Sequence, residues 1–383
     1  MKIAFIYDVP YPWHVGGIEA MNYNEAEELA KHHEVHYFTR KWPGMESEEF
    51  KKNGIIYHAS GDTDQSMIYK NGRRSIGEAI AYAFSINEIF NYKFDLVITN
   101  QFPILHLPVV RLYCAINKAK LIIEVAEVWD AKYWRSYLGV IPGSLAYPYS
   151  QLAALGADAY VTISSATTEN LKKFGISNGD ANTVRTFAPA IDDRLLNKIR
   201  SIKVKQRNKT VIFSGRLIKE KRVDKWIDLF AIAHAKDKSI RGLIIGKGPE
   251  KETLEKKIKN MGLSKKIAIR GFFDSNAEFY KTVRLSSVML HMSEREGLGI
   301  IAIESIALGT PVVLPTYTPL PKEVKEMCVV ADESKIPALI VAMAKSKTPQ
   351  KYIKNTKNLA QFSKSKVNAF YSRLFKSIKL RDK

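Results

Sequence analysis

Short apolar runs alternate with amphipathic stretches through the first half of the chain. The runs KIAFIY (2–7), EVHYFT (34–39), FDLVITN (94–100), KLIIEV (120–125) and DAYVTIS (158–164) have the length and composition of buried strands. The stretch 18–33, between the first two runs, has a helical pattern. Alternation of this kind predicts a parallel sheet covered by helices, which is an α/β fold.

The alternation restarts after residue 209. TVIFSG (210–215), GLIIG (242–246), KIAIRG (266–271) and SVMLHM (287–292) predict strands, and 223–235 and 250–262 predict helices between them. The stretch KIRSIKVKQRNK (198–209) contains six basic residues and no acidic residue. We therefore predict an N-terminal domain over 1–197, a basic linker over 198–209, a C-terminal domain over 210–345 and a basic tail over 346–383. With two such domains, the cleft between them is the expected binding site.

The tail contains one amphipathic segment, VNAFYSRLFKSI (367–378). Its apolar residues follow i, i+3, i+4 spacing and form one helix face opposite basic residues: Val367, Phe370, Tyr371, Leu374, Phe375 and Ile378. Such a helix can lie on an anionic membrane. We favour the alternative, in which it docks onto the body of the same protein.

Composition narrows the class of protein. The 383 residues are 46% hydrophobic, which excludes a disordered chain, and the net charge of +20 favours anionic partners. Nucleic acid is disfavoured, because no RRM, KH or helix-turn-helix signature is present. Cys114 and Cys328 are far apart, which argues against a disulfide framework or a structural zinc site. Without a signal peptide or an apolar run of transmembrane length, we expect a cytoplasmic protein, with peripheral attachment to the inner face of the membrane as an open alternative.

The stretch SEREGLGIIAIES (293–305) is the first candidate site. Its glycines predict a loop, and Ile300–Leu308 predicts a helix that ends at Gly309, so Glu296 lies at a helix start and Glu304 inside the helix. A helix start favours phosphate. In the alternative interpretation, Glu296 merely faces the helix dipole and Glu304 is a solvated carboxylate.

A second candidate is FSGRLIKEKRVDKW (213–226), which joins a predicted strand to a helix. Arg216 and Lys221 would leave the sheet edge at which ligands bind, and their cations suit a diphosphate. The alternative is a solvated basic loop. In PWHVGGIEAM (12–21), Gly16 and Gly17 would allow close backbone approach by a ligand, although a Gly-Gly pair is more often a turn.

Several other kinds of site are disfavoured. No His/Cys cluster has metal-ligand spacing, and neither a nucleophile elbow nor a dinucleotide fingerprint is present. His14, His106 and His291 are isolated in the sequence, and we interpret each as structural.

Four stretches together resemble a known family. GGIE (16–19), VTISSATTENLKKFGI (161–176), FSGRLIKEKRVDKW and SEREGLGIIAIESIALGTPVV (293–313) are similar to the family 4 retaining glycosyltransferases, and Glu296 and Glu304 match the ends of their E-x7-E signature. The resemblance covers about residues 1–345. It implies the GT-B fold, with two Rossmann-like, doubly wound domains facing across a cleft and a final helix that crosses back onto the first domain.

The resemblance also implies a donor substrate, a nucleotide-diphosphate sugar, bound by the second domain without a cofactor or an obligatory metal. Arg216 and Lys221 would hold the diphosphate, and the backbone N–H groups around Leu298 and Gly299 would bind it at the helix start. Arg216 and Lys221 would then do what Mg²⁺ does elsewhere, by stabilising negative charge on the leaving group.

The remaining implied contacts concern the sugars. Glu304 would accept the ribose hydroxyls, and Glu296 would contact the transferred sugar and support its cationic centre. Gly16 and Gly17 would approach the donor from the first domain. The implied acceptor is a glycan or a lipid-linked molecule.

The chain departs from the family pattern at two positions. Many relatives carry a histidine before the glutamate of the stretch IEVAEVWDAKYW (123–134), where this chain has Ala126 followed by Glu127. The usual Asn-Gly before the interdomain region is replaced by FAPAID (187–192). Ala126 keeps a second hypothesis open, that of a catalytically weak relative that binds sugar nucleotides or glycans.

Overall fold

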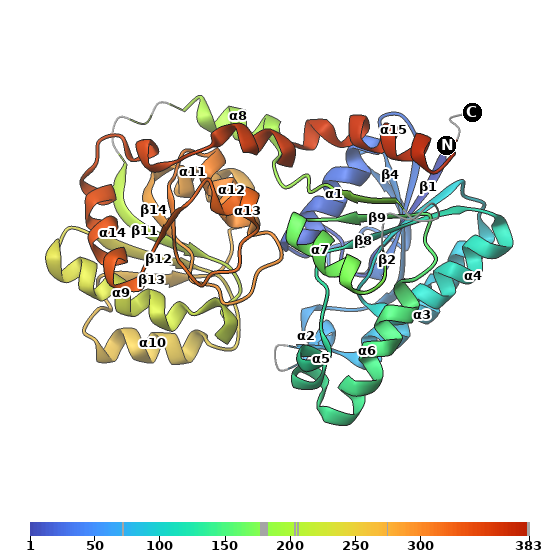
Figure 1. The fold of residues 1–383 in the computed structure, drawn as a ribbon, viewed down its shortest axis with the longest axis horizontal. Coiled ribbons are helices and arrows are strands. Elements are labelled where there is room, and N and C mark those ends of the chain that lie inside the picture. Colours follow the sequence, from blue (N-terminus) through green and yellow to red (C-terminus); the bar gives the residue numbers. More distant parts are fainter. Residues whose placement is uncertain (71–72, 177–182, 203, 205–206, 274, 381–383) are drawn as a thin grey trace. The chain divides into compact units, whose positions relative to one another are not determined.

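The structure is a computed structural model that describes residues 1–70, 73–176, 183–202, 204, 207–273 and 275–380. The chain forms two compact units, drawn in Figure 1. Unit 1 consists of Met1–Ala190 and Lys364–Lys383, and unit 2 of Ile191–Ser363. Each unit has its own sheet and core, and each is described by itself.

Unit 1 is built on an eight-stranded sheet of order β10-β9-β8-β7-β1-β2-β4-β3. All neighbouring strands run parallel except β3, which pairs antiparallel with β4 at one edge. The strands are β1 Lys2–Ile6, β2 Glu34–Lys41, β3 Glu49–Lys52, β4 Ile55–Asp62, β7 Leu96–Asn100, β8 Lys120–Val125, β9 Ala159–Thr162 and β10 Thr183–Thr186, and a small separate ladder joins β5 Tyr69–Lys70 to β6 Arg73–Arg74.

Helices cover both faces of this sheet. The helical elements of unit 1 are α1 Gly17–Leu29, α2 Gln65–Ile68, α3 Ile76–Ser85, η1 Ile86–Asn91, η2 Ile104–His106, α4 Leu107–Asn117, α5 Ala131–Leu138, α6 Val140–Ala154, α7 Ser165–Lys173, η7 Lys364–Lys366 and α15 Val367–Ser377. The core of one face joins α1 and α15 to the strands, and the core of the other joins α3, η1, α4, α6 and α7 to them. The sheet is therefore doubly wound.

The apolar face of α15 is buried in the core of unit 1. Figure 1 shows this helix, red, beside the blue elements α1 and β1. Phe370 stacks on Phe187 with ring centroids 4.2 Å apart, and the Tyr371 hydroxyl oxygen lies 2.7 Å from Glu25 Oε2 and 2.9 Å from Glu124 Oε1. This face is thus unavailable to a membrane, and the docked alternative for residues 367–378 holds.

Unit 2 is built on a six-stranded parallel sheet of order β13-β12-β11-β14-β15-β16. Its strands are β11 Asn208–Ser214, β12 Arg241–Ile245, β13 Ile267–Arg270, β14 Ser286–Leu290, β15 Val312–Pro315 and β16 Val329–Ala331. The chain winds outwards from β11 in one direction and from β14 in the other. That order is the Rossmann order, with its switch point between β11 and β14.

The helices of unit 2 also lie on both faces. They are α8 Asp193–Arg200, η3 Lys219–Lys221, α9 Val223–Lys236, α10 Lys251–Asn260, α11 Asn276–Leu285, α12 Ile300–Ala307, α13 Lys322–Lys325, η4 Glu333–Lys335, α14 Ile336–Lys345, η5 Pro349–Tyr352 and η6 Thr356–Phe362. One face carries α9, α10 and α14, and α11 and α12 contact the sheet elsewhere. The predicted class, two doubly wound α/β domains, is confirmed; the predicted cleft between them stays a prediction.

The boundary between the two units falls at residues other than those predicted from the sequence. Unit 2 already begins at Ile191, and the tail divides at 363/364, so residues 346–363 lie in unit 2 and residues 364–383 in unit 1. The stretch taken as a linker holds the end of α8 and the start of β11, while residues 203, 205 and 206 lie outside the described part. Arg207 of this stretch is buried and donates to Ser286 O over 2.9 Å and Gly309 O over 2.8 Å. A basic residue of the predicted linker therefore joins the start of β14 to the turn after α12.

Within the described residues, no helix combines the length and the apolar character needed to cross a bilayer.

Candidate functional site

The switch point of unit 2 places two loops next to each other. The loop after β11 contains Arg216 and η3, and the loop after β14 runs from His291 to Gly299. A backbone hydrogen bond of 2.9 Å from Glu294 N to Glu220 O joins the two loops. Because ligands of such sheets bind outside the carboxyl ends of the strands at the switch point, this edge is the candidate site.

Two predicted site residues meet here. Lys221 donates from Nζ to Glu296 Oε1 in a short ion pair, and the two side chains are 18% and 13% exposed. His291 Nε2 lies 3.2 Å from the same Glu296 oxygen, and His291 is buried. The turn after β14 thus brings His291, isolated in the sequence, against a site carboxylate, and its interpretation as structural stays a prediction.

This pairing fixes the charge of Glu296. Burial alone would raise the pKa of its carboxyl group, but the Lys221 ammonium and the His291 ring outweigh burial and hold that pKa well below its usual value. Glu296 is thus ionised throughout the neutral range. It can accept hydrogen bonds and stabilise positive charge, and it cannot act as a general acid.

The pair Arg222 and Glu294, which the sequence did not suggest as site residues, joins the two loops. Arg222 directly precedes α9, has a left-handed backbone (φ 48°) and forms an ion pair with Glu294. Arg222 Nε also lies 3.3 Å from Asp224 Oδ1. Together with the backbone bond at Glu220, these contacts fix the separation of the two loops and so the position of Lys221 beside Glu296.

Arg216 has a different environment. It is exposed, and no described side chain pairs with it. The next residue, Leu217, is buried and donates its backbone N–H to Lys247 O over 2.8 Å. Gly246 is required beside it, because a Cβ there would lie 1.9 Å from Gly215 O. The backbone at Arg216 is therefore fixed while its guanidinium group is available to a ligand.

The start of α12 follows the candidate loop. Gly299 has a left-handed backbone (φ 80°), a conformation that favours glycine, and a Cβ on it would also crowd the end of the Leu320 side chain. Leu298 is buried beside it. The first-turn N–H groups of α12 point out of this end of the helix, where they and the helix dipole favour an anion.

Glu304 lies on α12, one turn further along, and is half-buried. The Tyr280 hydroxyl of α11 donates to Glu304 Oε1 over 2.5 Å. Burial raises the pKa of the Glu304 carboxyl to about 7, and the hydrogen bond from Tyr280 opposes that rise only in part. Among the described residues no lysine or arginine pairs with it, so Glu304 is not the solvated carboxylate of the alternative interpretation.

In unit 1, Gly16 caps the start of α1 and Gly17 is its first residue. Gly16 has an extended backbone, and a Cβ on it would meet the movable end of the Glu19 side chain, so the fold itself does not require glycine at this position. His14 Nδ1 lies 3.6 Å from Glu19 Oε1. Burial would raise the pKa of Glu19, but His14 lowers it below its usual value. Contact of Gly16 and Gly17 with a donor stays a prediction.

Ala126 directly follows β8, at the carboxyl edge of the sheet of unit 1. Its carbonyl oxygen accepts from Thr167 Oγ1 over 3.4 Å, and the neighbouring Glu127 accepts from Trp129 Nε1 over 2.8 Å. Ala126, where the resemblance implies a histidine in relatives, thus lies at the carboxyl edge of the sheet, the edge at which ligands of such sheets bind.

Comparison with known families assigns both halves of the chain. The family model described as glycosyltransferase family 4 matches residues 15–193, and the model described as glycosyl transferases group 1 matches residues 196–363. The two matches meet close to the boundary between units 1 and 2. The chain therefore belongs to the glycosyltransferases of this type, as the resemblance predicted.

Individual relatives agree with this assignment. N-acetyl-α-D-glucosaminyl L-malate synthase of Bacillus anthracis is 25% identical over 266 aligned positions, which cover 60% of this chain and 68% of the relative. Sucrose-phosphate synthase from Thermosynechococcus elongatus has a TM-score of 0.73 at 16% identity over 99% of both chains. HepE from Anabaena, solved in complex with UDP-glucose, has a TM-score of 0.68 at 15% identity over 98% of this chain and 100% of that one. The fold is the predicted GT-B fold, and the chain is a glycosyltransferase.

Proposed function

We propose that this glycosyltransferase transfers a sugar from a nucleoside diphosphate onto a glycan or lipid-linked acceptor, with retention of the anomeric configuration. The observation that carries the proposal is the direct pair of Lys221 and Glu296 at the switch point of unit 2. In this proposal, Lys221 is the cation for the leaving group and Glu296 is the ionised carboxylate beside it. Breaking the bond between sugar and diphosphate puts negative charge on the diphosphate and positive charge on the sugar ring, and this pair is complementary to both.

The diphosphate is held by protein groups, without an obligatory metal. Arg216 is exposed and has no competing partner among the described residues, so its fork can bind two phosphate oxygens. Lys221 supplies the second cation. The N–H groups at Leu298 and Gly299 supply the helix-start dipole. HepE, the UDP-glucose complex of similar fold, supports a nucleoside diphosphate sugar as donor.

The two glutamates recognise the two sugars of the donor. Glu304 accepts the ribose hydroxyls, with Tyr280 holding one of its oxygens and leaving the other available. Glu296 faces the transferred sugar, because Lys221 ties it to the diphosphate end of the site. Its low pKa supports a role as a fixed negative charge rather than as a proton donor.

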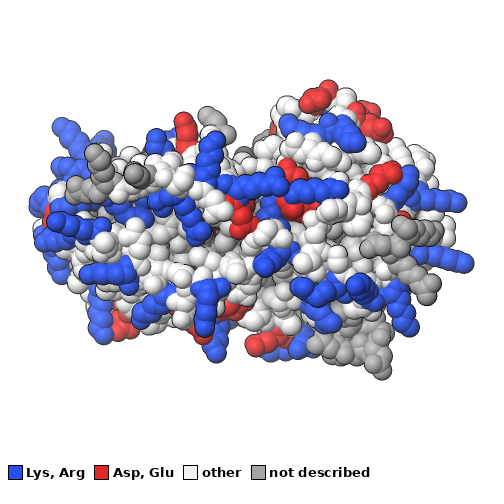
Figure 2. Space-filling model, turned by 90° about the horizontal axis from the view of Figure 1, so that it is seen from above, with Lys and Arg blue, Asp and Glu red and all other residues white. Residues whose placement is uncertain are grey.

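We further propose that the protein binds the surface of an anionic membrane. Figure 2 shows lysine and arginine outnumbering acidic side chains on the face drawn, in keeping with the net charge of +20. Unit 1 adds an apolar element, the start of α6, where Val140, Ile141 and Leu145 are 72%, 77% and 69% exposed. The adjoining α5 carries exposed Lys132 and Arg135. Basic and apolar residues together favour an interfacial position.

The second candidate is a relative that binds a sugar nucleotide without efficient transfer, and Ala126 favours it. A panel of UDP-, GDP- and ADP-sugars separates the two, with unfolding temperature and release of nucleoside diphosphate as readouts. Transfer predicts stabilisation and turnover with the same donor, since a ligand of the native state raises apparent stability. Stabilisation without release in the presence of acceptor extracts would support the weak relative. No response to any donor would contradict both.

A further inference from the structure

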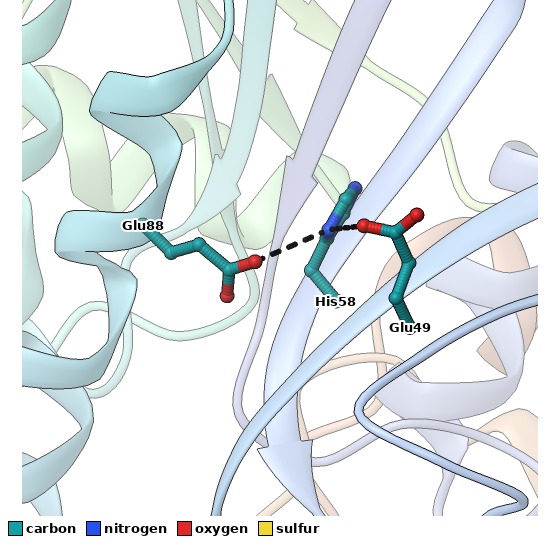
Figure 3. A group of neighbouring side chains, drawn as sticks. All are labelled: Glu49, His58 and Glu88. Atoms are coloured by element: carbon teal, nitrogen blue, oxygen red, sulfur yellow. Dashed lines mark ion pairs between the residues drawn. The ribbon is translucent and has the colours of Figure 1, made fainter.

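A group of polar side chains lies in unit 1, away from every residue assigned above. Glu49 on β3, His58 on β4 and Glu88 on η1 come together at the edge of the sheet, as Figure 3 shows. His58 Nδ1 lies 3.3 Å from Glu49 Oε2 and 3.5 Å from Glu88 Oε1. Glu49 and His58 are direct partners across the β3–β4 ladder, so the backbone itself holds the first pair.

His58 is 1% exposed, and its Nδ1 has no hydrogen-bond partner among the described residues. Its other nitrogen, Nε2, lies 2.8 Å from His36 Nδ1, and His36 Nε2 lies 3.0 Å from Glu34 Oε1. A carboxylate only accepts, so His36 Nε2 donates to Glu34. With both rings neutral, His36 Nδ1 must accept, and His58 Nε2 must donate to it.

With both rings neutral, this chain of hydrogen bonds leaves His58 Nδ1 without a proton. Nδ1 is left with a lone pair that faces two carboxylate oxygens, an arrangement that repels unless a cation lies between them. In the described part of this very basic chain, no lysine or arginine pairs with Glu49 or Glu88.

We propose that Glu49, His58 and Glu88 bind a divalent cation, with Zn²⁺ as the best match. Zn²⁺ takes histidine nitrogen and carboxylate oxygen at about 2.0–2.1 Å, which puts adjacent ligand atoms of a tetrahedral site about 3.3–3.4 Å apart. The two distances from His58 Nδ1 agree with that spacing. The two carboxylate oxygens lie within 4.8 Å of each other, and both side chains are exposed enough to close the gap, at 62% for Glu49 and 35% for Glu88.

The surroundings fit a metal-bound histidine. Such a ligand donates its second ring N–H to a fixed acceptor, and here His36, backed by Glu34, is that acceptor. The Tyr92 hydroxyl donates to Glu49 Oε2 over 3.1 Å and so orients the first carboxylate. Water completes the coordination. The cation would tie η1 to the β3–β4 hairpin, which forms the exposed edge of the sheet, so its role is structural.

The test uses the full chain without an affinity tag, treated with a chelator and returned to metal-free buffer. Calorimetry with ZnCl₂ should show one site, and Zn²⁺ should raise the unfolding temperature while equal Mg²⁺ leaves it unchanged. Glu49→Gln and Glu88→Gln should each weaken Zn²⁺ binding at least about tenfold. Glu46→Gln, an exposed neighbour with the same charge change, should bind as the parent does. These carboxylates are preferred to His58, whose replacement could unfold the edge.

Three results would overturn the proposal. One is no Zn²⁺ binding at all. Another is equal binding by the parent and both cluster variants, which means an adventitious ion only. The third is a lower unfolding temperature for Glu49→Gln in chelator without any Zn²⁺ response in the parent, which means that a protonated His58 pairs with the carboxylates. Binding of nucleoside diphosphate, measured in parallel, should be the same in every variant, so the outcome is independent of the proposed function.

Discussion

Lys221 and Glu296 come from loops 75 residues apart and form one ion pair at the switch point of unit 2. Neither residue is solvated: their side chains are 18% and 13% exposed. The site therefore exists as a charged unit before any ligand binds. A diphosphate must share Lys221 with Glu296, and the carboxylate thereby stays close to the phosphate end of the donor.

This pair makes the two residues energetically dependent on each other. Lys221→Met leaves the Glu296 carboxylate mostly buried beside His291 alone, which should cost about 2 kcal/mol of unfolding free energy. The double variant Lys221→Met/Glu296→Gln should lose less than the sum of the single variants, as measured by denaturant unfolding. Lys219→Met, exposed in the same turn, is the control and should change stability by less than about 0.5 kcal/mol. Strict additivity would mean that the pair is absent in solution.

Glu304 predicts a pH dependence of nucleotide binding. Burial raises the pKa of its carboxyl to about 7, and only the ionised form can accept two ribose hydroxyls. Binding must therefore release a proton below that pKa, so affinity should rise about tenfold between about pH 6 and pH 8 and level off above. Calorimetry across this range is the measurement. In Glu304→Gln, the remaining pH dependence of affinity arises from ionisation of the phosphate. The difference between the pH curves of the two proteins therefore gives the contribution of the Glu304 carboxyl. Parallel pH curves would count against ribose recognition by Glu304.

A histidine in place of Ala126 should change how the enzyme handles the donor sugar. If it leaves space beside the transferred sugar, Ala126→His should change turnover or donor preference, while affinity for the free nucleoside diphosphate stays within about twofold. Steady-state rates over a donor panel check this, with Ala126→Asn as a polar control without a ring. Unchanged kinetics with every donor would mean that the position lies away from the sugar.

Membrane attachment should depend on both charge and apolar exposure. Each lysine or arginine near an anionic surface contributes about 1 kcal/mol, and this attraction weakens with salt. Flotation with anionic vesicles should recover the protein at low salt and lose it at high salt. Ile141→Ser/Leu145→Ser on α6 should weaken recovery, and Ile232→Ser on α9, also exposed, should not. Equal recovery with neutral vesicles would contradict an electrostatic surface interaction.

Local signals in the sequence predicted much of the fold. The helix expected over 300–308 spans Ile300–Ala307, because Gly299 and Gly309 both have left-handed backbones that begin and end it. The apolar spacing over 367–378 likewise identified a docked helix, and all six apolar residues are buried. Such features depend on residues close together in the chain, where spacing and glycine positions are informative.

Contacts between distant segments could not be predicted in this way. Nothing in a basic stretch shows that Arg207 will be buried against the carbonyl groups of Ser286 and Gly309. The contact of His291 with Glu296 lies within one loop, but it depends on the conformation of the turn after β14, which residue spacing does not give. No metal-ligand spacing in the sequence identifies Glu49, His58 and Glu88. The pairing of β3 with β4 brings the first two together, and η1 adds Glu88. Strand pairing and loop conformation bring these residues together, and the local sequence pattern gives neither.

The most direct test of the account compares Glu296→Gln with Glu304→Gln and Arg216→Ala. Removing a charge-assisted partner costs about 1.5–3 kcal/mol, or roughly ten- to a hundredfold in binding. Calorimetry with the free nucleoside diphosphate should show that loss for Glu304→Gln and Arg216→Ala, and almost none for Glu296→Gln. Steady-state turnover should fall strongly for Glu296→Gln, because its carboxylate acts on the sugar as charge develops. If Glu296→Gln instead loses nucleotide affinity as Glu304→Gln does, or keeps full turnover, the division of labour proposed for this site is contradicted.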